Sequence, residues 1–254
     1  MLYPRIIPCL LLHNNGLVKT KKFKNPKYIG DPINAVKIFN EKEVDELIVL
    51  DIDATPMNRE PDYKLIQNLA SQCRMPLCYG GGVKTMAQAK KILSLGVEKI
   101  AVSSAVSNNL NLISEISKEI GSQSLAIILD VKKKFFKGYQ VKFKNNENEY
   151  NLLEIIKKIE SLGAGEIIIN SIDNDGMMKG YDLNLACEVK NKLNIPMTIL
   201  GGAGSLKDIS KVIEKFKIIG CGVGSLFIFK GKYKAVLINY PNKENKKKII
   251  NNLL

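Results

Sequence analysis

The chain has 254 residues, 45% of them hydrophobic, and carries a formal net charge of +13. No apolar run approaches the roughly 18 residues of a membrane-spanning helix, and with 7% aromatic residues and no Trp the sequence lacks the stacking platforms of nucleic-acid-binding proteins. We therefore expect neither a membrane nor a nucleic-acid partner. Because the lysines are scattered among Asn and Ile, we interpret the positive charge as compositional bias and as a field that collects a phosphorylated small-molecule substrate.

The five cysteines are odd in number and lack paired spacing, which is typical of a reducing compartment and disfavours disulfides and zinc sites. His13 is the only histidine, so a multi-histidine metal cluster is excluded. We expect a cytoplasmic protein with no metal and no cofactor. The first nine residues contain two prolines and no basic region, and are expected to form a strand and not a signal peptide.

Short apolar segments alternate with amphipathic segments, and no linker-like stretch separates them. The expected strands, in chain order, are residues 5–12, 46–52, 77–79, 100–102, 125–130, 166–170, 198–200 and 218–221. The expected helices are residues 32–42, 63–73, 86–95, 110–120, 152–162, 183–193 and 206–215. Units of this kind at this length predict an α/β fold, a single (β/α)8 TIM barrel over residues 1–254 with its active site at the C-terminal ends of the strands.

Two segments depart from this rhythm. Residues 135–143 alternate around a Lys-Gly turn, which predicts a hairpin after the fifth strand. The basic segment 243–254 is expected to be a last helix or a frayed tail. For the end of the chain we weigh a new docking surface against a solvated tail, and favour a basic tail over about residues 241–254.

The sequence repeats itself at half its length, which predicts two half-barrels over about residues 1–121 and 122–230. Glycine turns at 80–82 and 201–204 each end a strand and open a helix, through Thr85 and Ser205 respectively. Such a turn attracts anions, because backbone N–H groups and the helix dipole point at the ligand. A serine-bearing loop follows the next strand in each half. We therefore expect two phosphate sites, suited to a substrate with a phosphate at each end.

A set of short motifs accompanies these turns. They are Arg5-Ile6-Ile7-Pro8-Cys9-Leu10, Gly16-Leu17-Val18-Lys19, Gly30-Asp31-Pro32, Asp45-Glu46-Leu47, the glycine turns, Leu162-Gly163-Ala164-Gly165-Glu166, Asp173-Asn174-Asp175-Gly176 and Gly180-Tyr181-Asp182. Over about residues 2–228 the chain resembles the cyclase subunit of imidazole glycerol phosphate synthase. The resemblance implies a (β/α)8 barrel that takes ammonia from a partner glutaminase, and that cleaves and cyclises a bis-phosphorylated substrate.

The family uses two aspartates as a general acid/base pair, and this chain keeps one of them. Asp130, which ends the fifth strand, is the expected catalytic residue, whereas Leu11 stands where the family has the other aspartate. Leucine can neither accept nor donate a proton, so Asp51, Asp175 and His13 are weighed as relocated partners. For His13 we favour a loop residue without a role.

A second departure is Met177, which follows Asp175-Gly176 where the family has threonine. The phosphate framework is complete. The residues expected to bind the substrate phosphates are Lys19, Gly81, Gly82, Ser103, Ser104, Asp175, Gly176, Gly202, Gly224 and Ser225.

The resemblance also implies an ammonia gate at the bottom of the barrel, formed by Arg5, Glu46, Lys99 and Glu166. Without the family match, two cations and two anions at strand N-terminal ends are more often a structural salt-bridge plug. With it, we favour the gate. Glu98 resembles the acidic residue that the family presents to its glutaminase, although the family residue is Asp.

Three segments fit one branch of the family. Residues 23–32, 38–47 and 234–241 resemble cyclase paralogues encoded with bacterial surface-sugar genes. Those paralogues imply a glutaminase and a sugar amidotransferase as partners, and conversion of an acetamido group to an acetamidino group. We favour this ammonia-handling role. The alternatives are the histidine-biosynthetic cyclase and a non-catalytic phospholigand-binding activator of the glutaminase.

Overall fold

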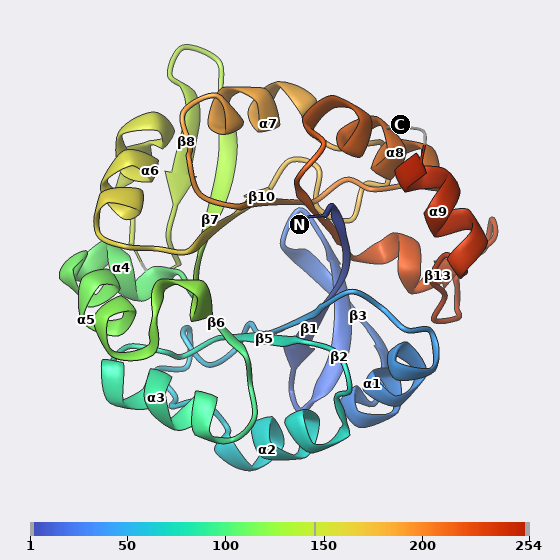
Figure 1. Ribbon diagram of the computed structural model, residues 1–254, viewed down its shortest axis with the longest axis horizontal. Coiled ribbons are helices and arrows are strands. Elements are labelled where there is room, and N and C mark those ends of the chain that lie inside the picture. Colours follow the sequence, from blue (N-terminus) through green and yellow to red (C-terminus); the bar gives the residue numbers. More distant parts are fainter. Residues whose placement is uncertain (1–2, 145, 252–254) are drawn as a thin grey trace.

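The computed structural model describes residues 3–144 and 146–251, and within them parallel strands close into a barrel (Figure 1). In chain order the barrel strands are β1 (Arg5–His13), β4 (Leu47–Asp51), β5 (Leu77–Gly80), β6 (Lys99–Val102), β7 (Leu125–Lys134), β10 (Glu166–Ser171), β11 (Met197–Leu200) and β12 (Gly220–Val223). β12 pairs with β1, and β10 pairs with β7, so the sheet closes on itself. The expected (β/α)8 barrel is confirmed.

Helices surround this barrel in the predicted order. They are α1 (Pro32–Glu41), α2 (Tyr63–Gln72), α3 (Met86–Ser94), α5 (Asn111–Ile120), α6 (Leu152–Ser161), α7 (Leu183–Lys190) and α8 (Leu206–Phe216), with a 3₁₀ turn η1 (Ser122–Ser124) before β7. All except α5 begin with a side chain that accepts a hydrogen bond from a first-turn N–H, namely Asp31, Asp62, Thr85, Asn151, Asp182 and Ser205. Each such cap typically stabilises its helix by ~1 kcal/mol. No helix in the described ranges is long and apolar enough to span a bilayer.

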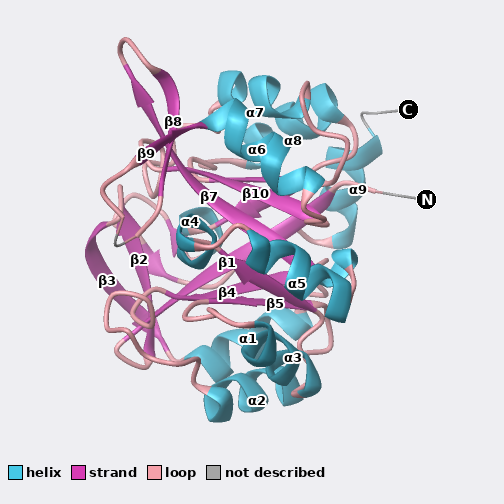
Figure 2. Ribbon diagram, turned by 90° about the vertical axis from the view of Figure 1, so that its left-hand side faces the viewer, coloured by secondary structure: helices cyan, strands magenta, loops and turns pink. Residues whose placement is uncertain are grey.

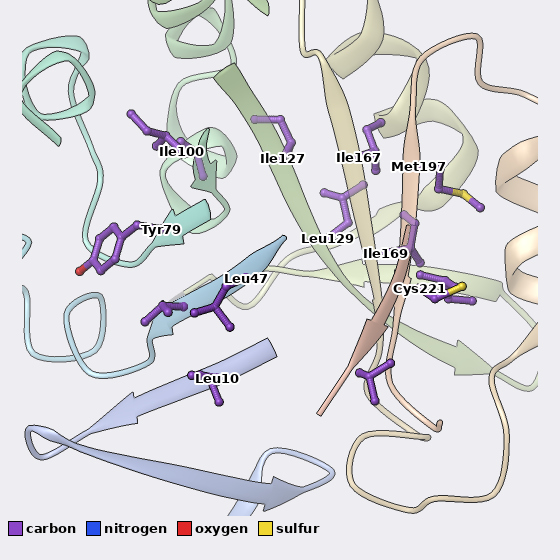
Figure 3. Close-up of a cluster of buried hydrophobic side chains, with 14 of the residues drawn as sticks. Leu10, Leu47, Tyr79, Ile100, Ile127, Leu129, Ile167, Ile169, Met197 and Cys221 are labelled. Carbon is purple, nitrogen blue, oxygen red and sulfur yellow. The ribbon is translucent and has the colours of Figure 1, made fainter. Parts of the chain in front are cut away.

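Successive side chains of a strand point to opposite faces, which produces two separate cores. Outward-facing Ile127, Leu129 and Ile169 belong to the larger cluster, between the strands and the helices (Figure 3). Inward-facing Ile128 and Ile168 belong to a smaller apolar cluster inside the barrel. The alternation therefore decides which polar side chains near the strand ends can face the interior.

A hairpin that the sequence pattern did not predict follows β1. β2 (Gly16–Lys21) pairs antiparallel with the end of β1, and β3 (Lys24–Gly30) pairs with β2. Asn14 and Asn15 connect β1 to β2 with φ values of 49° and 61°. Asparagine tolerates positive φ at both central positions of a tight hairpin turn, so the Asn-Asn pair was the signal in the sequence.

The predicted hairpin after the fifth strand is present, with its strands displaced. β7 continues past the barrel and pairs with β8 (Gly138–Lys142), which in turn pairs with β9 (Glu149–Asn151). Phe135 and Phe136 lie in the turn, 94% and 93% exposed, and not in the first strand of the hairpin as the alternation suggested. Both hairpins extend from the same face of the barrel, opposite α9 (Lys243–Asn251) (Figure 2).

The C-terminal segment corrects the expectation of a solvated tail. After the short pair β13 (Phe229–Lys230) and β14 (Ala235–Val236), α9 packs against α8 and buries Ile249. The ammonium of Lys246 pairs with the Asp45 carboxylate, and the Tyr240 hydroxyl donates to the carbonyl oxygen of Ile6 over 2.9 Å. Apolar burial and these contacts outweigh the repulsion among the lysines of α9. Residues 252–254 of the expected tail lie outside the described residues.

The anchoring contact of Tyr240 is testable. Tyr240→Phe removes the partly buried hydrogen bond to Ile6, and should lower the free energy of unfolding by about 1 kcal/mol in urea titrations. Tyr233→Phe is the matched control, because Tyr233 is 91% exposed. Equal stability of both variants would show that the contact between Tyr240 and Ile6 does not anchor the C-terminal segment to β1.

Candidate functional site

A cavity of about 620 Å³ opens at the C-terminal ends of the barrel strands. It is lined by every residue expected to act in catalysis or phosphate binding: Lys19, Gly81, Gly82, Ser103, Ser104, Asp130, Asp175, Gly176, Gly202, Gly224 and Ser225. Leu11 lines the same cavity, and His13 does not. These residues come from both halves of the chain, so barrel closure assembles the candidate site.

The two glycine turns have backbone conformations that require glycine. Gly81 has φ +124°, and a Cβ there would lie 2.4 Å from the carbonyl oxygen of Asp51. Gly202 has φ +110°, and its Cβ would lie 2.2 Å from the carbonyl oxygen of Gly180. Each turn leads to a capping box, at Thr85 before α3 and at Ser205 before α8. Each half-barrel thus forms the same backbone structure, a glycine turn followed by a capped helix start, which we call its cradle.

Two short helical turns face the cavity without a side-chain cap. α4 (Ser104–Asn108) follows Ser103, and the 3₁₀ turn η2 (Ser225–Phe227) follows Gly224. Neither start receives a capping hydrogen bond from a side chain. Their first N–H groups are therefore suited to an anion, as the serine loops predicted. The sequence pattern missed α4 because five residues are too few to show helical periodicity.

Lys19 extends from β2 toward Gly224, in the predicted phosphate site of the second half-barrel. It is 5% exposed, and its ammonium donates to the carbonyl oxygen of Cys9. A Cβ on Gly224 would lie 3.4 Å from its Nζ, so the ammonium lies beside that predicted site. Burial lowers the pKa of Lys19, while Asp175 acts in the opposite direction. Asp175 also accepts hydrogen bonds from Thr20 Oγ1 (2.7 Å) and the backbone N–H of Phe23 (3.1 Å).

Asp130 lies in the cavity with an amide partner, Asn170, that no sequence pattern predicts. Asn170 Nδ2 donates to Asp130 Oδ1 over 2.9 Å, because β7 and β10 pair these two residues in register. Burial raises the pKa of Asp130 to about 6, although the hydrogen bond from Asn170 acts to lower it. A carboxyl group with this pKa can exchange a proton near neutral pH.

The other half of the barrel has no such pair. Leu11 lies in register with Leu50, and both line the cavity. The acid/base geometry is therefore one-sided, with a carboxylate and an amide on one half and two leucines on the other.

The three candidates for a relocated partner already have hydrogen-bond or ion-pair partners of their own. Asp51 Oδ1 accepts from the N–H groups of Asp53 and Ala54 (2.9 and 3.0 Å), and its Oδ2 lies 3.6 Å from Arg59. Asp175 holds the β2–β3 hairpin as described. His13 Nδ1 lies 2.7 Å from Asp53 Oδ1, outside the cavity. Asp51 and Asp175 line the cavity together with Asp130, and the charge of Asp175 adds to the rise in the pKa of Asp130, but the strand-one position itself holds Leu11.

At the other end of the barrel, Arg5, Glu46, Lys99 and Glu166 form a closed ring of ion pairs. Lys99 Nζ lies 2.8 Å from Glu46 Oε1 and 2.7 Å from Glu166 Oε2, and Arg5 bridges the same two carboxylates from the other side. Burial alone would raise the pKa of Glu166, but Lys99 and Arg5 lower it to about 2. The four expected gate residues are thus brought together, with charges that satisfy one another.

Glu98 lies beside this ring and is exposed. Its Oε2 accepts a hydrogen bond from the backbone N–H of Leu77 over 2.7 Å, which fixes the carboxylate at the N-terminal edge of β5. No group of three His, Cys, Asp or Glu side chains suited to a metal ion is found in the ranges described above.

Comparison with known proteins identifies the class and then the family. The model for "Histidine biosynthesis protein" matches residues 5–234. Two relatives share the name "Putative imidazole glycerol phosphate synthase subunit": hisF3 of Vibrio vulnificus (54% identity, 98% of this chain, 97% of the relative) and hisF2 of Pseudomonas aeruginosa (49%, 95% and 97%). The imidazole glycerol phosphate synthase subunit HisF of Clostridium botulinum is 36% identical over 96% of this chain and 98% of its own.

The fold is a (β/α)8 barrel, and the family model places the chain in the class of histidine biosynthesis proteins. Within that class, the chain belongs to the HisF family.

The ring makes a stability prediction. Lys99→Ala leaves the Glu46 and Glu166 carboxylates with one cation, and should lower the free energy of unfolding by about 3 kcal/mol at neutral pH. Because the folded-state pKa of Glu166 is depressed, the ring stabilises the protein above the ordinary glutamate pKa and loses this effect as pH falls toward 2. The deficit of the variant should therefore shrink in acid.

The matched control is Lys90→Ala, which removes an exposed ion pair with Glu119 and should cost less than about 1 kcal/mol. Urea unfolding of both variants across the acid range measures the effect. A deficit that does not change with pH would contradict the assignment to ion pairing.

The glycine requirement is also testable. Gly81→Ala should lower the free energy of unfolding by roughly 2–4 kcal/mol, because the Cβ collides with the Asp51 carbonyl oxygen. Gly138→Ala is the control: its φ is also positive, at +65°, but a Cβ there meets nothing within 4 Å, so about 1 kcal/mol is expected. Equal losses in thermal unfolding would mean that the close approach at Gly81 is unimportant.

Proposed function

We propose that this chain receives ammonia from a partner glutaminase at the Arg5–Glu46–Lys99–Glu166 ring and delivers it through the barrel to the cavity, for the amidination of a surface sugar. The sugar amidotransferase that converts an acetamido group to an acetamidino group is the proposed consumer. The observation that carries the proposal is the combination of a complete ring with an acid/base site that has lost one of its two carboxylates.

The barrel interior suits a small neutral molecule. Between the ring and the cavity it is lined by apolar or small side chains: Ile7, Cys9, Ile48, Cys78, Ala101, Ala126, Ile128, Ile168 and Leu200. An ammonium ion would lose its hydration there at high cost, whereas neutral ammonia would not. Passage through the ring requires at least one of its ion pairs to separate, so the ring can act as a gate.

The cavity argues against efficient cyclisation by this chain alone. A positioned acid or base typically contributes a factor of roughly 10²–10⁴, and Leu11 offers neither function. Asp51 and Asp175 already hold backbone groups and hairpins, so neither replaces it without giving up those contacts. Delivery of ammonia needs the ring, the interior and the cavity, but not the second carboxylate.

The names of the relatives do not separate the two pathways. Relatives at 54% and 49% identity carry the numbered names hisF3 and hisF2, whereas two Leptospira relatives at 53% and 52% carry the unnumbered name HisF. The glutaminase would dock at the ring end of the barrel, where Glu98 is exposed.

The second candidate is the histidine-pathway cyclase, favoured by the complete set of phosphate-site residues and by Asp130 with a pKa of about 6. A phospholigand-binding activator of the glutaminase is a third reading, favoured by the same cavity.

The test supplies the purified chain and its glutaminase with ammonium salt and the bis-phosphorylated histidine-pathway substrate. We expect turnover at least about a hundredfold below that of a two-aspartate enzyme. Leu11→Asp combined with Met177→Thr should raise it, because the phosphate cradles are already in place. Substantial turnover by the unmodified chain would overturn the proposal in favour of the cyclase.

Delivery through the barrel is tested with the whole sugar system. Lys99→Ala should reduce glutamine-dependent product formation while leaving the reaction with added ammonium salt unchanged, since external ammonia does not need the ring. Lys90→Ala is the control and should change neither. If Lys99→Ala leaves glutamine-dependent formation intact, ammonia does not pass through the ring and the activator reading is preferred.

A further inference from the structure

One buried acceptor in the cavity lacks a hydrogen-bond partner. Asn170 is 8% exposed, and its Oδ1 receives no hydrogen bond from the described part of the chain, while its Nδ2 is used by Asp130. A buried oxygen without a donor costs roughly 1–3 kcal/mol. Buried polar groups are nearly always paired, so this oxygen is an acceptor open to a small molecule that brings an N–H or O–H donor.

The oxygen lies where the apolar interior ends. Ile168 and Asn170 are two residues apart on β10 and both face inward, Ile168 in the inner apolar cluster and Asn170 in the cavity lining. On the neighbouring strand, Ile128 and Asp130 repeat this order. A molecule that leaves the interior therefore meets the Asp130–Asn170 pair at the floor of the cavity.

Space beside this oxygen depends on a glycine. Gly201 has φ +94°, and a Cβ there would lie 3.4 Å from Asn170 Oδ1 and 2.8 Å from the carbonyl oxygen of Ser171. A side chain at this position would therefore cover the acceptor. The glycine keeps it open to a small donor.

In the opposite half of the barrel, two leucines occupy the positions that correspond to Asp130 and Asn170. Leu50 occupies the register position next to Leu11 that Asn170 occupies next to Asp130. A donor molecule is therefore held from one side only, by a carboxylate and an amide oxygen, and faces leucine side chains on the other.

From this geometry we propose that Asn170 Oδ1 and the Asp130 carboxylate form an ammonia-binding subsite at the point where the barrel interior opens into the cavity. The proposal rests on the ammonia-delivery role proposed above. Ammonia has three N–H donors for these two acceptors, and its lone pair stays free to face the cavity. Asn170 is thus a positioning residue that retains ammonia before its transfer.

Binding is tested without any partner, by the side-chain amide signal of Asn170 in ¹⁵N-labelled protein, assigned by its absence in Asn170→Leu. Unlabelled ammonium chloride at mildly alkaline pH should shift this signal saturably, and sodium chloride at equal ionic strength should not. The side-chain amide of Asn174, which donates to the carbonyl oxygen of Gly180 and lies outside the cavity lining, is the internal control. No shift, or the same shift with both salts, would overturn the subsite and leave water as the occupant.

Kinetics in the complete system separate positioning from structure. Asn170→Leu copies the residue of the other half, and should raise the KM for ammonium chloride about tenfold, the equivalent of one lost hydrogen bond, with kcat and the KM for the sugar little changed. Asn170→Thr, which restores an acceptor, should recover part of the loss. A fall in kcat and in thermal stability without a change in the ammonium KM would mean a structural role only. If the unmodified complex makes no product, the delivery role fails, while the salt titration still decides the subsite.

Discussion

Parallel pairing of β7 with β10 closes the barrel. The register of this pairing positions both the ion-pair ring at one end of the barrel and the Asp130–Asn170 pair at the other. This pairing places Glu166 beside Ala126 at one end and Asn170 beside Asp130 at the other. Because side chains alternate along a strand, Glu166, Ile168 and Asn170 all face inward, one level above another. A slip of one residue would turn all three outward and abolish the ring, the apolar interior and the polar pair together.

This single constraint explains how a half-barrel repeat supports an asymmetric site. The repeat preserves what depends on backbone: both glycine turns, both capping boxes and both uncapped short turns. Inward side chains are free to differ between the halves. Asp130 and Asn170 therefore face Leu11 and Leu50 within a framework that remains symmetric for anions. The symmetry concerns the backbone turns expected to bind phosphates, and the asymmetry concerns the side chains that could transfer a proton.

Much of this arrangement was predictable from the sequence, because period-two apolar runs and glycine turns encode strands and their ends directly. The eight barrel strands and the glycine and serine loops of the cavity followed from those signals, whereas Asp130, Lys19 and Asp175 were expected from the family resemblance. The Asp130–Asn170 contact did not, since register between strands far apart in the chain is set by closure and not by local pattern. A last helix was one of the two expectations for the basic segment, but its packing was not predicted. Its lysines favoured a solvated tail, and the anchors of the segment, Asp45 and Ile6, lie near the other end of the sequence.

The central claim is that ammonia travels inside the barrel, and competition between isotopes tests it most directly. The complete system is given glutamine labelled with ¹⁵N in the amide, together with an excess of unlabelled ammonium chloride, and the label in the product is measured by mass spectrometry. Transfer through the interior predicts product that remains mostly ¹⁵N-labelled, because ammonia released at the ring does not mix with the solution. Product whose label matches that of the bulk ammonium would contradict the account.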